Sequence, residues 1–173
     1  MSAWRHVRAI GLLPGVVTVV VPAVIVGTGE AVQVGWGLPA GLALLPLLVG
    51  VALIALGLSL MIRTVALFAS VGEGTLAPWD PTSRLVVRGP YRHVRNPMIS
   101  GVLSVLLGEA ALLGSLQLLI WFAAVFAVNA VYMPLVEEPG LVQRFGADYE
   151  TYRAHVRRWV PSPRPWDPRR DRR

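Results

Sequence analysis

Cationic and aromatic side chains crowd one short stretch of this chain, just before a proline. Tyr91, Arg92, His93 and Arg95 all lie within six residues of Pro97. Guanidinium and imidazolium groups bind carboxylates and phosphates, and they also stack on aromatic rings. Pro97 is suited to the first turn of a helix, because the N–H that proline lacks has no partner there. The stretch therefore predicts an anion-binding cluster at the entrance of a helix.

A second cluster is acidic and also stands beside a proline. Glu137 and Glu138 precede Pro139, and acidic residues followed by proline are typical of a helix start. Adjacent carboxylates can hold a cation or pair with the arginines of the first cluster. The chain has no cysteine, which excludes a thiolate metal site and a thiol nucleophile. We predict no metal site.

The elements that position these clusters are apolar stretches of membrane-spanning character. Hydrophobic residues make up 54% of the 173 residues and charged residues 15%, and mean hydropathy is +0.58. A helix needs about 20 apolar residues to cross a bilayer. Four stretches are candidates, the third being short and containing Glu109: residues 9–29, 38–62, 98–113 and 116–136. The predicted fold class is an all-α integral membrane protein of about four transmembrane helices, the last two forming a C-terminal helical hairpin, with cytoplasmic amphipathic tail helices.

The arginines give an independent indication of topology. Lysine is absent, and two of the 16 arginines precede the first stretch, five lie between the second and third, and nine follow the fourth. Because arginines near span ends stay on the cytoplasmic side, four spans with both termini in the cytoplasm place all of them on one side. The net charge of +6 then reflects topology, and nucleic acid is not a predicted partner. Exclusive use of arginine favours a GC-rich genome, so the predicted location is a bacterial cytoplasmic membrane.

The same topology brings the two clusters together. Pro97 opens the outgoing arm of the hairpin and Glu137 closes the returning arm, so both lie at the cytoplasmic face. Ionisable groups so close to hydrocarbon are costly unless they are paired or functional. Two interpretations stay open: a functional site, or a structural clamp in which Arg95 pairs with Glu137 or Glu138.

An aromatic stripe follows the acidic pair. Its members recur at helical spacings of three and four: Phe145, Tyr149, Tyr152, Val156 and Trp159. We expect a helix that lies on the headgroups with Arg153, Arg157 and Arg158 toward lipid phosphates, or one that covers the site as a lid. The basic end of the chain has no apolar periodicity, and we expect it to be disordered or to lie on the membrane surface.

In both clusters the chain resembles the integral-membrane methyltransferases of the isoprenylcysteine carboxyl methyltransferase and phospholipid N-methyltransferase superfamily. The resemblance covers residues 74–161. The first motif of that superfamily matches Gly89, Pro90, Tyr91, Val94, Arg95, Pro97 and Gly101. The second motif matches Glu137, Glu138, Leu141, Phe145, Gly146, Tyr149, Tyr152, Trp159 and Pro161.

The resemblance implies transfer of a methyl group from S-adenosyl-L-methionine to a lipid or small hydrophobic acceptor at the cytoplasmic membrane face. It gives Arg95, Asn96 and Glu138 as catalytic residues. The cofactor-binding residues it implies are Gly89, Tyr91, His93, Arg95, Pro97, Gly101, Glu137 and Glu138. Asn96 stands where the superfamily pattern has histidine, and asparagine can exchange hydrogen bonds but cannot act as a base.

Domain boundaries follow from the same reasoning. We predict an N-terminal two-span region at 1–63, a methyltransferase-like core at 64–161 and a disordered basic tail at 162–173. Two other functions remain: a non-catalytic small membrane protein that retains the scaffold, and a relative of the membrane sterol reductases, which have a similar Arg-His-Pro element but more spans.

Overall fold

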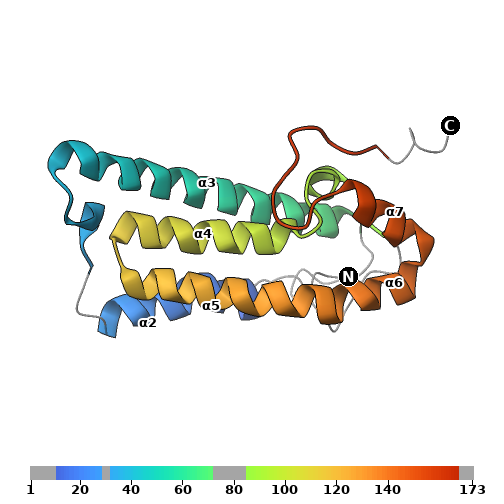
Figure 1. Cartoon of the computed structure of the whole chain (residues 1–173), viewed down its shortest axis with the longest axis horizontal. Helices are drawn as coiled ribbons and strands as arrows, with labels where there is room; N and C mark the ends of the chain where they lie inside the picture. The colour runs from blue at the N-terminus through green and yellow to red at the C-terminus, as the bar shows by residue number, and fades with distance from the viewer. Residues whose placement is uncertain (1–10, 29–31, 72–84, 168–173) are drawn as a thin grey trace. The chain divides into compact units, whose positions relative to one another are not determined.

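The computed structural model describes residues 11–28, 32–71 and 85–167, and these contain helices and no strand. The α-helices, labelled in Figure 1, are α2 (Val21–Thr28), α3 (Ala40–Val71), α4 (Pro97–Leu113), α5 (Leu116–Tyr132), α6 (Glu138–Phe145) and α7 (Ala147–His155). The other helical segments are the π-helical η1 (Gly11–Val20) and η4 (Met133–Glu137) and the 3₁₀-helical η2 (Val34–Gly37) and η3 (Gly89–Arg92). The prediction of an all-α chain is confirmed for these residues.

The helices belong to two compact units, which we describe separately. The apolar unit contains residues 11–28, 32–59 and 101–129, and the site unit contains residues 60–71, 85–100 and 130–167. Helices α3, α4 and α5 each contribute to both units. Glu109 is the one charged residue among the described residues of the apolar unit.

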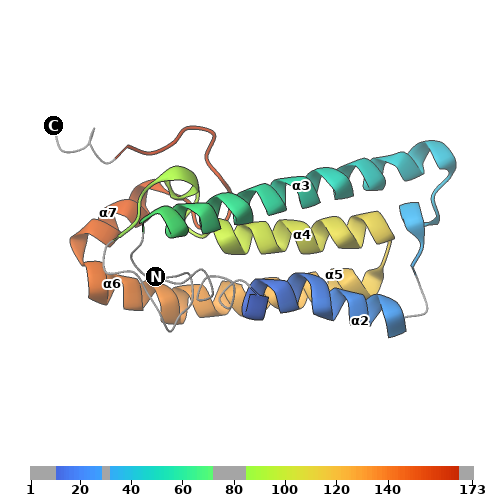
Figure 2. The ribbon, with the colours of Figure 1, turned by 180° about the vertical axis from the view of Figure 1, so that it is seen from behind.

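Glycines let α3 and α4 approach closely within the apolar unit, where the two helices run side by side in Figures 1 and 2. A Cβ atom built on Gly57 would lie 2.6 Å from the carbonyl oxygen of Gly101, and one built on Gly50 would lie 2.8 Å from that of Gly108. Real Cβ atoms do not come so close to a backbone oxygen. The α3–α4 contact is therefore backbone against backbone, as in other membrane helix pairs with small residues at the interface.

Tryptophan side chains form long-range hydrogen bonds within the apolar unit. The indole N–H of Trp121 on α5 donates to the carbonyl of Val17 at 3.1 Å, and that of Trp36 donates to the carbonyl of Ala111 at 3.1 Å. Gly114, with a φ of +58°, makes the turn between α4 and α5. This turn matches the hairpin break predicted from Gly114 and Ser115.

Two helical segments are long and apolar enough to cross a membrane, Ala40–Ser70 and Leu116–Phe145. Most of the large side chains on them are exposed, as expected for contact with lipid. Two shorter apolar helices cover Pro14–Thr28 and Pro97–Leu113. The second predicted span underestimates α3, which continues past Arg63 to Val71.

The helix start expected at Glu137 and Glu138 is present, because α6 begins at Glu138, but no break in the chain's helical course precedes it. Helical geometry is continuous from Leu116 to Phe145, and both glutamates have right-handed helical φ and ψ angles. Pro134 and Pro139 each remove a backbone donor from this segment, and the π-helical turn η4 contains Pro134 and ends two residues before Pro139. A π-turn inside a helix changes its hydrogen-bond register, so the helix accommodates both prolines without ending.

In the site unit, the aromatic stripe lies in a core rather than on an apolar exterior. Tyr149, Tyr152 and Val156 are at most 3% exposed. They pack against Leu85, Val87, Leu141, Val142, Phe145 and Trp166. The interpretation that these aromatics rest on the headgroups is therefore wrong, since protein side chains bury them. Helix α7 ends at His155, so Trp159 is not on the helix at all.

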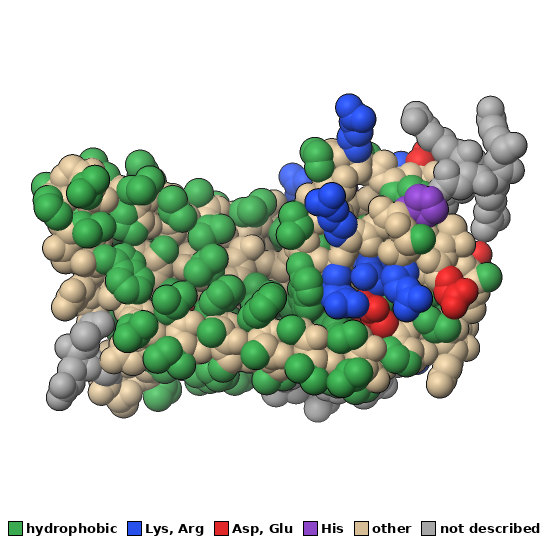
Figure 3. All heavy atoms as spheres, in the orientation of Figure 1, with side chains coloured by type: hydrophobic (Ala, Val, Ile, Leu, Met, Phe, Trp, Pro, Cys, Tyr) green, Lys and Arg blue, Asp and Glu red, His purple; other side chains and the backbone are tan. Residues whose placement is uncertain are grey.

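Charge and hydropathy differ between the units. On the face drawn in Figure 3, the hydrophobic side chains cover the apolar unit, and the arginine, acidic and histidine side chains gather on the site unit. The polar chemistry of the described residues is thus concentrated in the site unit, with Glu109 as the exception.

Candidate functional site

The loop before α4 is shaped by a glycine and held by a tyrosine. Gly89 has a φ of +53°, which favours glycine, and it begins the 3₁₀ turn η3. The hydroxyl of Tyr152 donates to the backbone carbonyl of Tyr91 at 2.7 Å. The Tyr91 ring in turn meets Phe68 of α3 edge to face, with 5.8 Å between ring centres. The first predicted cluster is therefore fixed by α3 and α7.

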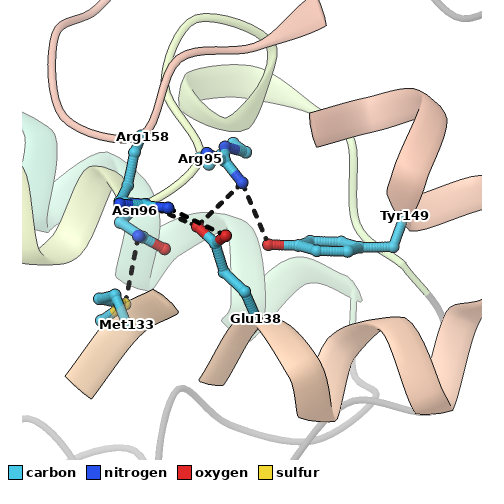
Figure 4. Close-up of polar contacts among 6 residues, drawn as sticks. All are labelled: Arg95, Asn96, Met133, Glu138, Tyr149 and Arg158. Atoms are coloured by element: carbon cyan, nitrogen blue, oxygen red, sulfur yellow. Dashed lines mark hydrogen bonds and ion pairs between the residues drawn. The ribbon is translucent and has the colours of Figure 1, made fainter. Parts of the chain in front are cut away.

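Glu138 lies at the centre of the site. Its side chain is 6% exposed and pairs with two arginines, as Figure 4 shows. Arg95 places Nη1 2.9 Å from Oε1. Arg158 donates from Nε to Oε1 at 2.6 Å and from Nη2 to Oε2 at 3.0 Å. The prediction that Arg95 and Glu138 lie together is confirmed: the Glu138 carboxylate accepts two hydrogen bonds from Arg158 and forms an ion pair with Arg95.

Arg95 is the more enclosed of the two arginines. Its side chain is 9% exposed, against 28% for Arg158. Nη1 of Arg95 also donates to the hydroxyl of Tyr149 at 3.4 Å, while its Nε is buried and has no hydrogen-bond partner among the described residues. A buried donor without a partner is uncommon and costly. The Nε group is thus a buried donor whose hydrogen-bonding capacity is unused among the described residues.

A segment after α7, which we call the C-terminal strap (residues 157–167), runs along the loop before α4. The loop donates once to the strap, from the backbone N–H of Arg95 to the carbonyl of Arg157 at 2.8 Å. The strap donates twice to the loop, from the N–H of Ser162 to the carbonyl of His93 at 2.8 Å and from the N–H of Trp166 to the carbonyl of Arg92 at 2.9 Å. Residues 162–167 were expected to be disordered, but here they bond to Arg92 and His93. Residues 168–173 lie outside the described residues.

His93 and Asn96 contact protein groups rather than open space. Nδ1 of His93 lies 2.7 Å from the carbonyl oxygen of Ser162, in the strap. The side-chain amide of Asn96 donates to the sulfur of Met133 at 3.2 Å, as Figure 4 also shows. Pro97 is buried at the first position of α4, as its sequence context predicts.

Two residues of the predicted set are not members of the ion cluster. Gly101 belongs to the apolar unit, where its carbonyl lies against Gly57 of α3. Glu137 is half-buried, and its carboxylate makes no hydrogen bond with the described residues. Its negative charge nevertheless acts on Tyr91 and Tyr149, whose pKa values it raises. Glu137 is therefore near the site without being paired in it.

Burial alters the acid–base behaviour of the surrounding side chains. Desolvation raises the pKa of Tyr91, Tyr149 and Tyr152 above the usual value of 10.0, and Arg95 opposes the shift at the last two. The hydrogen bond to Glu138 raises the pKa of Arg158. The tyrosines therefore stay neutral and the arginine stays charged at physiological pH.

Sequence reasoning missed Arg158 as a partner of Glu138. Arg158 is 20 residues from Glu138 and lies beyond the end of α7, so helical spacing gives no information about it. Its neighbours Arg157 and Trp159 favour an interpretation as a lipid-facing arginine. The one signal in the sequence is electrostatic: two adjacent carboxylates require more cations than Arg95 alone.

These features define an all-helical protein with helices long enough to cross a membrane and a buried, hydrogen-bonded cluster of charges. The family model of the phospholipid methyltransferases matches residues 45–148, about 60% of the chain. The chain therefore belongs to this family of membrane methyltransferases, as its motifs predicted. The match includes Arg95, Glu137 and Glu138 and ends before Arg158. Comparisons with curated proteins and with solved structures give no match.

Proposed function

We propose that this protein transfers a methyl group from S-adenosyl-L-methionine to a lipid or small hydrophobic acceptor at the cytoplasmic face of the membrane. The observation that carries the proposal is the buried donor of Arg95 beside the Glu138 carboxylate, within the segment that matches the family. A charged cluster so close to apolar helices costs folding free energy. A binding role explains why such a cluster is kept.

The residues present fit the polar end of S-adenosylmethionine. Its α-amino group needs an acceptor such as Glu138 or Glu137. Its α-carboxylate needs a guanidinium donor, and the cluster offers two, Arg95 with its Nε buried and unpaired among the described residues, and Arg158. When bound, the cofactor supplies an electrophilic methyl group for in-line displacement by the acceptor, a reaction without an obligatory metal. Orienting the reactants can supply several kcal/mol of the barrier or more.

The chain's own residues would act mainly by positioning. Arg95 and Glu138 bind the polar end of the cofactor, and Gly89, Tyr91 and Pro97 shape the loop that carries Arg95. Asn96, through its amide, orients ligand atoms by hydrogen bonding and takes no proton. His93 contributes through its contact with Ser162, which joins the loop to the strap. Gly101 contributes to helix packing.

The acceptor class follows from the surroundings. Within the site unit, the large apolar side chains of Val131, Leu135 and Val136 are exposed. They offer a lipid-facing approach for a hydrophobic molecule, and the family is that of phospholipid methyltransferases. A lipid with a nucleophilic headgroup atom is therefore the favoured acceptor.

One observation favours a second candidate, a non-catalytic membrane protein that retains the scaffold. Both oxygens of Glu138 are already paired with arginines, which is the arrangement that a structural clamp requires. Under this candidate the ion cluster would hold the loop, α6 and the strap together and would bind no cofactor.

Glu138→Gln distinguishes the two candidates. Purified protein in detergent is titrated with S-adenosylmethionine by calorimetry, and its melting temperature is measured on the same preparation. If Glu138 binds the cofactor, the variant loses affinity by roughly 10- to 150-fold per folded molecule, the value of one charge-assisted hydrogen bond. The clamp alternative instead predicts a lower melting temperature with unchanged affinity per folded molecule.

Glu150→Gln is the matched control, because Glu150 is an exposed carboxylate on α7. It should change neither affinity nor melting temperature. Transfer of labelled methyl from S-adenosylmethionine to membrane lipids by the unmodified protein completes the test. Absence of both cofactor binding and methyl transfer in that protein would contradict the proposed function.

A further inference from the structure

The ion cluster of the site unit carries one positive charge in excess. Two guanidinium groups, from Arg95 and Arg158, surround the single carboxylate of Glu138. Arg158 binds it with two parallel donors, the geometry in which a guanidinium recognises a carboxylate group. A ligand with both an ammonium and a carboxylate could exchange partners with this pair. The net charge of the cluster would not change, and each charged group would still have a partner of opposite sign.

The two arginines differ in their freedom to make such an exchange. Arg95 is 9% exposed, and its backbone N–H is bonded to the carbonyl of Arg157. Arg158 is 28% exposed, so its guanidinium borders open space. Of the two cations, Arg158 is therefore the one that can turn away from Glu138 toward solvent. Glu138 would then keep its ion pair with Arg95.

The backbone around Arg158 does not need to move. On one side, the carbonyl of Arg157 accepts the N–H of Arg95 at 2.8 Å. On the other side, the carbonyl of Trp159 accepts the hydroxyl of Ser100 at 3.1 Å. Rotation of the Arg158 side chain alone would free an oxygen of Glu138, while the C-terminal strap keeps its bonds to the loop before α4.

We propose that the Arg158–Glu138 ion pair is a receptor for a zwitterion, in which Glu138 takes the ligand's ammonium and Arg158 takes its carboxylate. The inference rests on the proposed function, since it assigns this exchange to the α-amino-acid end of the cofactor. Arg158 is then a specificity-determining residue beyond the segment that the family model matches. Without a ligand, Arg158 and Glu138 bind each other, so the negative charge of Glu138 keeps a partner until a ligand binds.

The test compares two ligands that differ in the carboxylate alone. S-adenosylmethionine and its decarboxylated analogue are titrated by calorimetry into the full-length unmodified protein, Arg158→Gln and Arg157→Gln. Arg157 is the matched control, because its side chain is exposed and makes no ion pair with the described residues.

We expect Arg158→Gln to weaken S-adenosylmethionine binding by roughly 10- to 150-fold. Its affinity for the decarboxylated analogue should be unchanged or higher, because the competing cation is gone. Arg157→Gln should leave both affinities unchanged. Equal losses for both ligands in Arg158→Gln, or no loss for either, would overturn the inference.

A second comparison requires no variant. The unmodified protein should bind S-adenosylmethionine more tightly than the decarboxylated analogue by a similar factor, and equal affinities overturn the inference even if Arg158→Gln does not fold. A phosphoethanolamine lipid also carries an ammonium and an anion. If such a lipid, added in mixed micelles, displaces S-adenosylmethionine, and Arg158→Gln abolishes this competition, the pair receives the acceptor and the assignment to the cofactor is wrong.

Failure of the proposed function has a different signature. In that case the unmodified protein binds neither ligand, whereas failure of this inference alone leaves cofactor binding intact and independent of Arg158.

Discussion

The three-residue cluster of Arg95, Glu138 and Arg158 shows how charge is kept beside apolar helices. Burying ions costs several kcal/mol for each, and the cost is recovered only when geometry and hydrogen bonding are good. Glu138 meets that condition with two hydrogen bonds from Arg158 and an ion pair with Arg95. Arg95 does not meet it completely, because its Nε stays unpaired among the described residues. The unpaired Nε therefore leaves a desolvation cost at Arg95, a residue that the sequence motifs connect with function.

Alkaline pH should destabilise the site unit. Burial raises the pKa of Tyr91, Tyr149 and Tyr152 above 10.0, so above that pH the unfolded chain loses protons that the folded chain retains. The free energy of unfolding then decreases with rising pH, by about 1.4 kcal/mol per pH unit for each tyrosine that stays protonated. Below about pH 9 these groups should give no pH dependence. Denaturant unfolding in detergent at a series of pH values measures the free energy of unfolding. Tyrosinate absorbance in the same samples shows at which pH the hydroxyls ionise.

Tyr152→Phe is the control for this prediction. It removes one of the three groups, together with the bond to the carbonyl of Tyr91, so its stability should be lower at neutral pH and should fall less steeply above pH 10. A tyrosinate signal that appears before unfolding would show that these hydroxyls ionise in the folded protein, against the prediction.

At the scale of elements, the boundaries of α4 were predictable and those of α3 were not. Helix α4 begins at Pro97, one residue before the predicted start, and ends at Leu113 as expected. Proline at the first turn and Gly114 at a positive φ mark both ends through local backbone chemistry. The second span was expected to end before Arg63, but a helix can continue beyond its apolar stretch, and α3 does so to Val71.

Contacts between distant elements were harder to predict. The neighbourhood of Arg95 and Glu138 followed from hairpin topology, which is a local argument. The bond from Arg158 to Glu138 and the bonds of the strap to His93 depend on how the chain returns after α7. The helical spacing continues in the sequence to Trp159, although α7 ends at His155, and residues 160–167 have no periodicity, so sequence patterns contain little information about that return.

The glycine contact between α3 and α4 makes a sharp prediction. Gly57→Ala places a Cβ atom 2.6 Å from the carbonyl oxygen of Gly101, so the helices must separate or shift. We expect a loss of about 1 to 3 kcal/mol, the usual cost of overpacking. Thermal or denaturant unfolding in detergent measures it.

Gly41→Ala is the matched control in the same helix, since a Cβ atom there meets nothing within 4 Å. It should be neutral, or stabilising by about 0.5 to 1 kcal/mol because alanine is the better helix former. Equal effects of the two substitutions would mean that the close approach at Gly57 contributes nothing to stability.

For the whole molecule, we expect four membrane spans. Two helical segments are long enough by themselves, and α4 is a shorter apolar helix of 17 residues. A helix of this length rises about 25 Å, slightly less than the hydrocarbon thickness. Charge supports its crossing, because nine arginines follow α5 and five lie between the second apolar stretch and α4. If α4 did not cross, these two groups would lie on opposite sides, against the retention of arginine in the cytoplasm.

Reporter fusions test this topology directly. A reporter that is active only outside the cytoplasm should give no signal when fused after Arg173, and a strong signal when inserted at Ser115, in the turn between α4 and α5. A reporter active only in the cytoplasm should give the reverse pattern, which controls for expression and folding of each fusion. A strong signal from the outside-active reporter after Arg173 would mean that the C-terminus lies outside the cytoplasm, against the predicted topology. The arginines after α5 would then lie outside, and neither Glu138 nor Arg158 could meet a cofactor that comes from the cytoplasm.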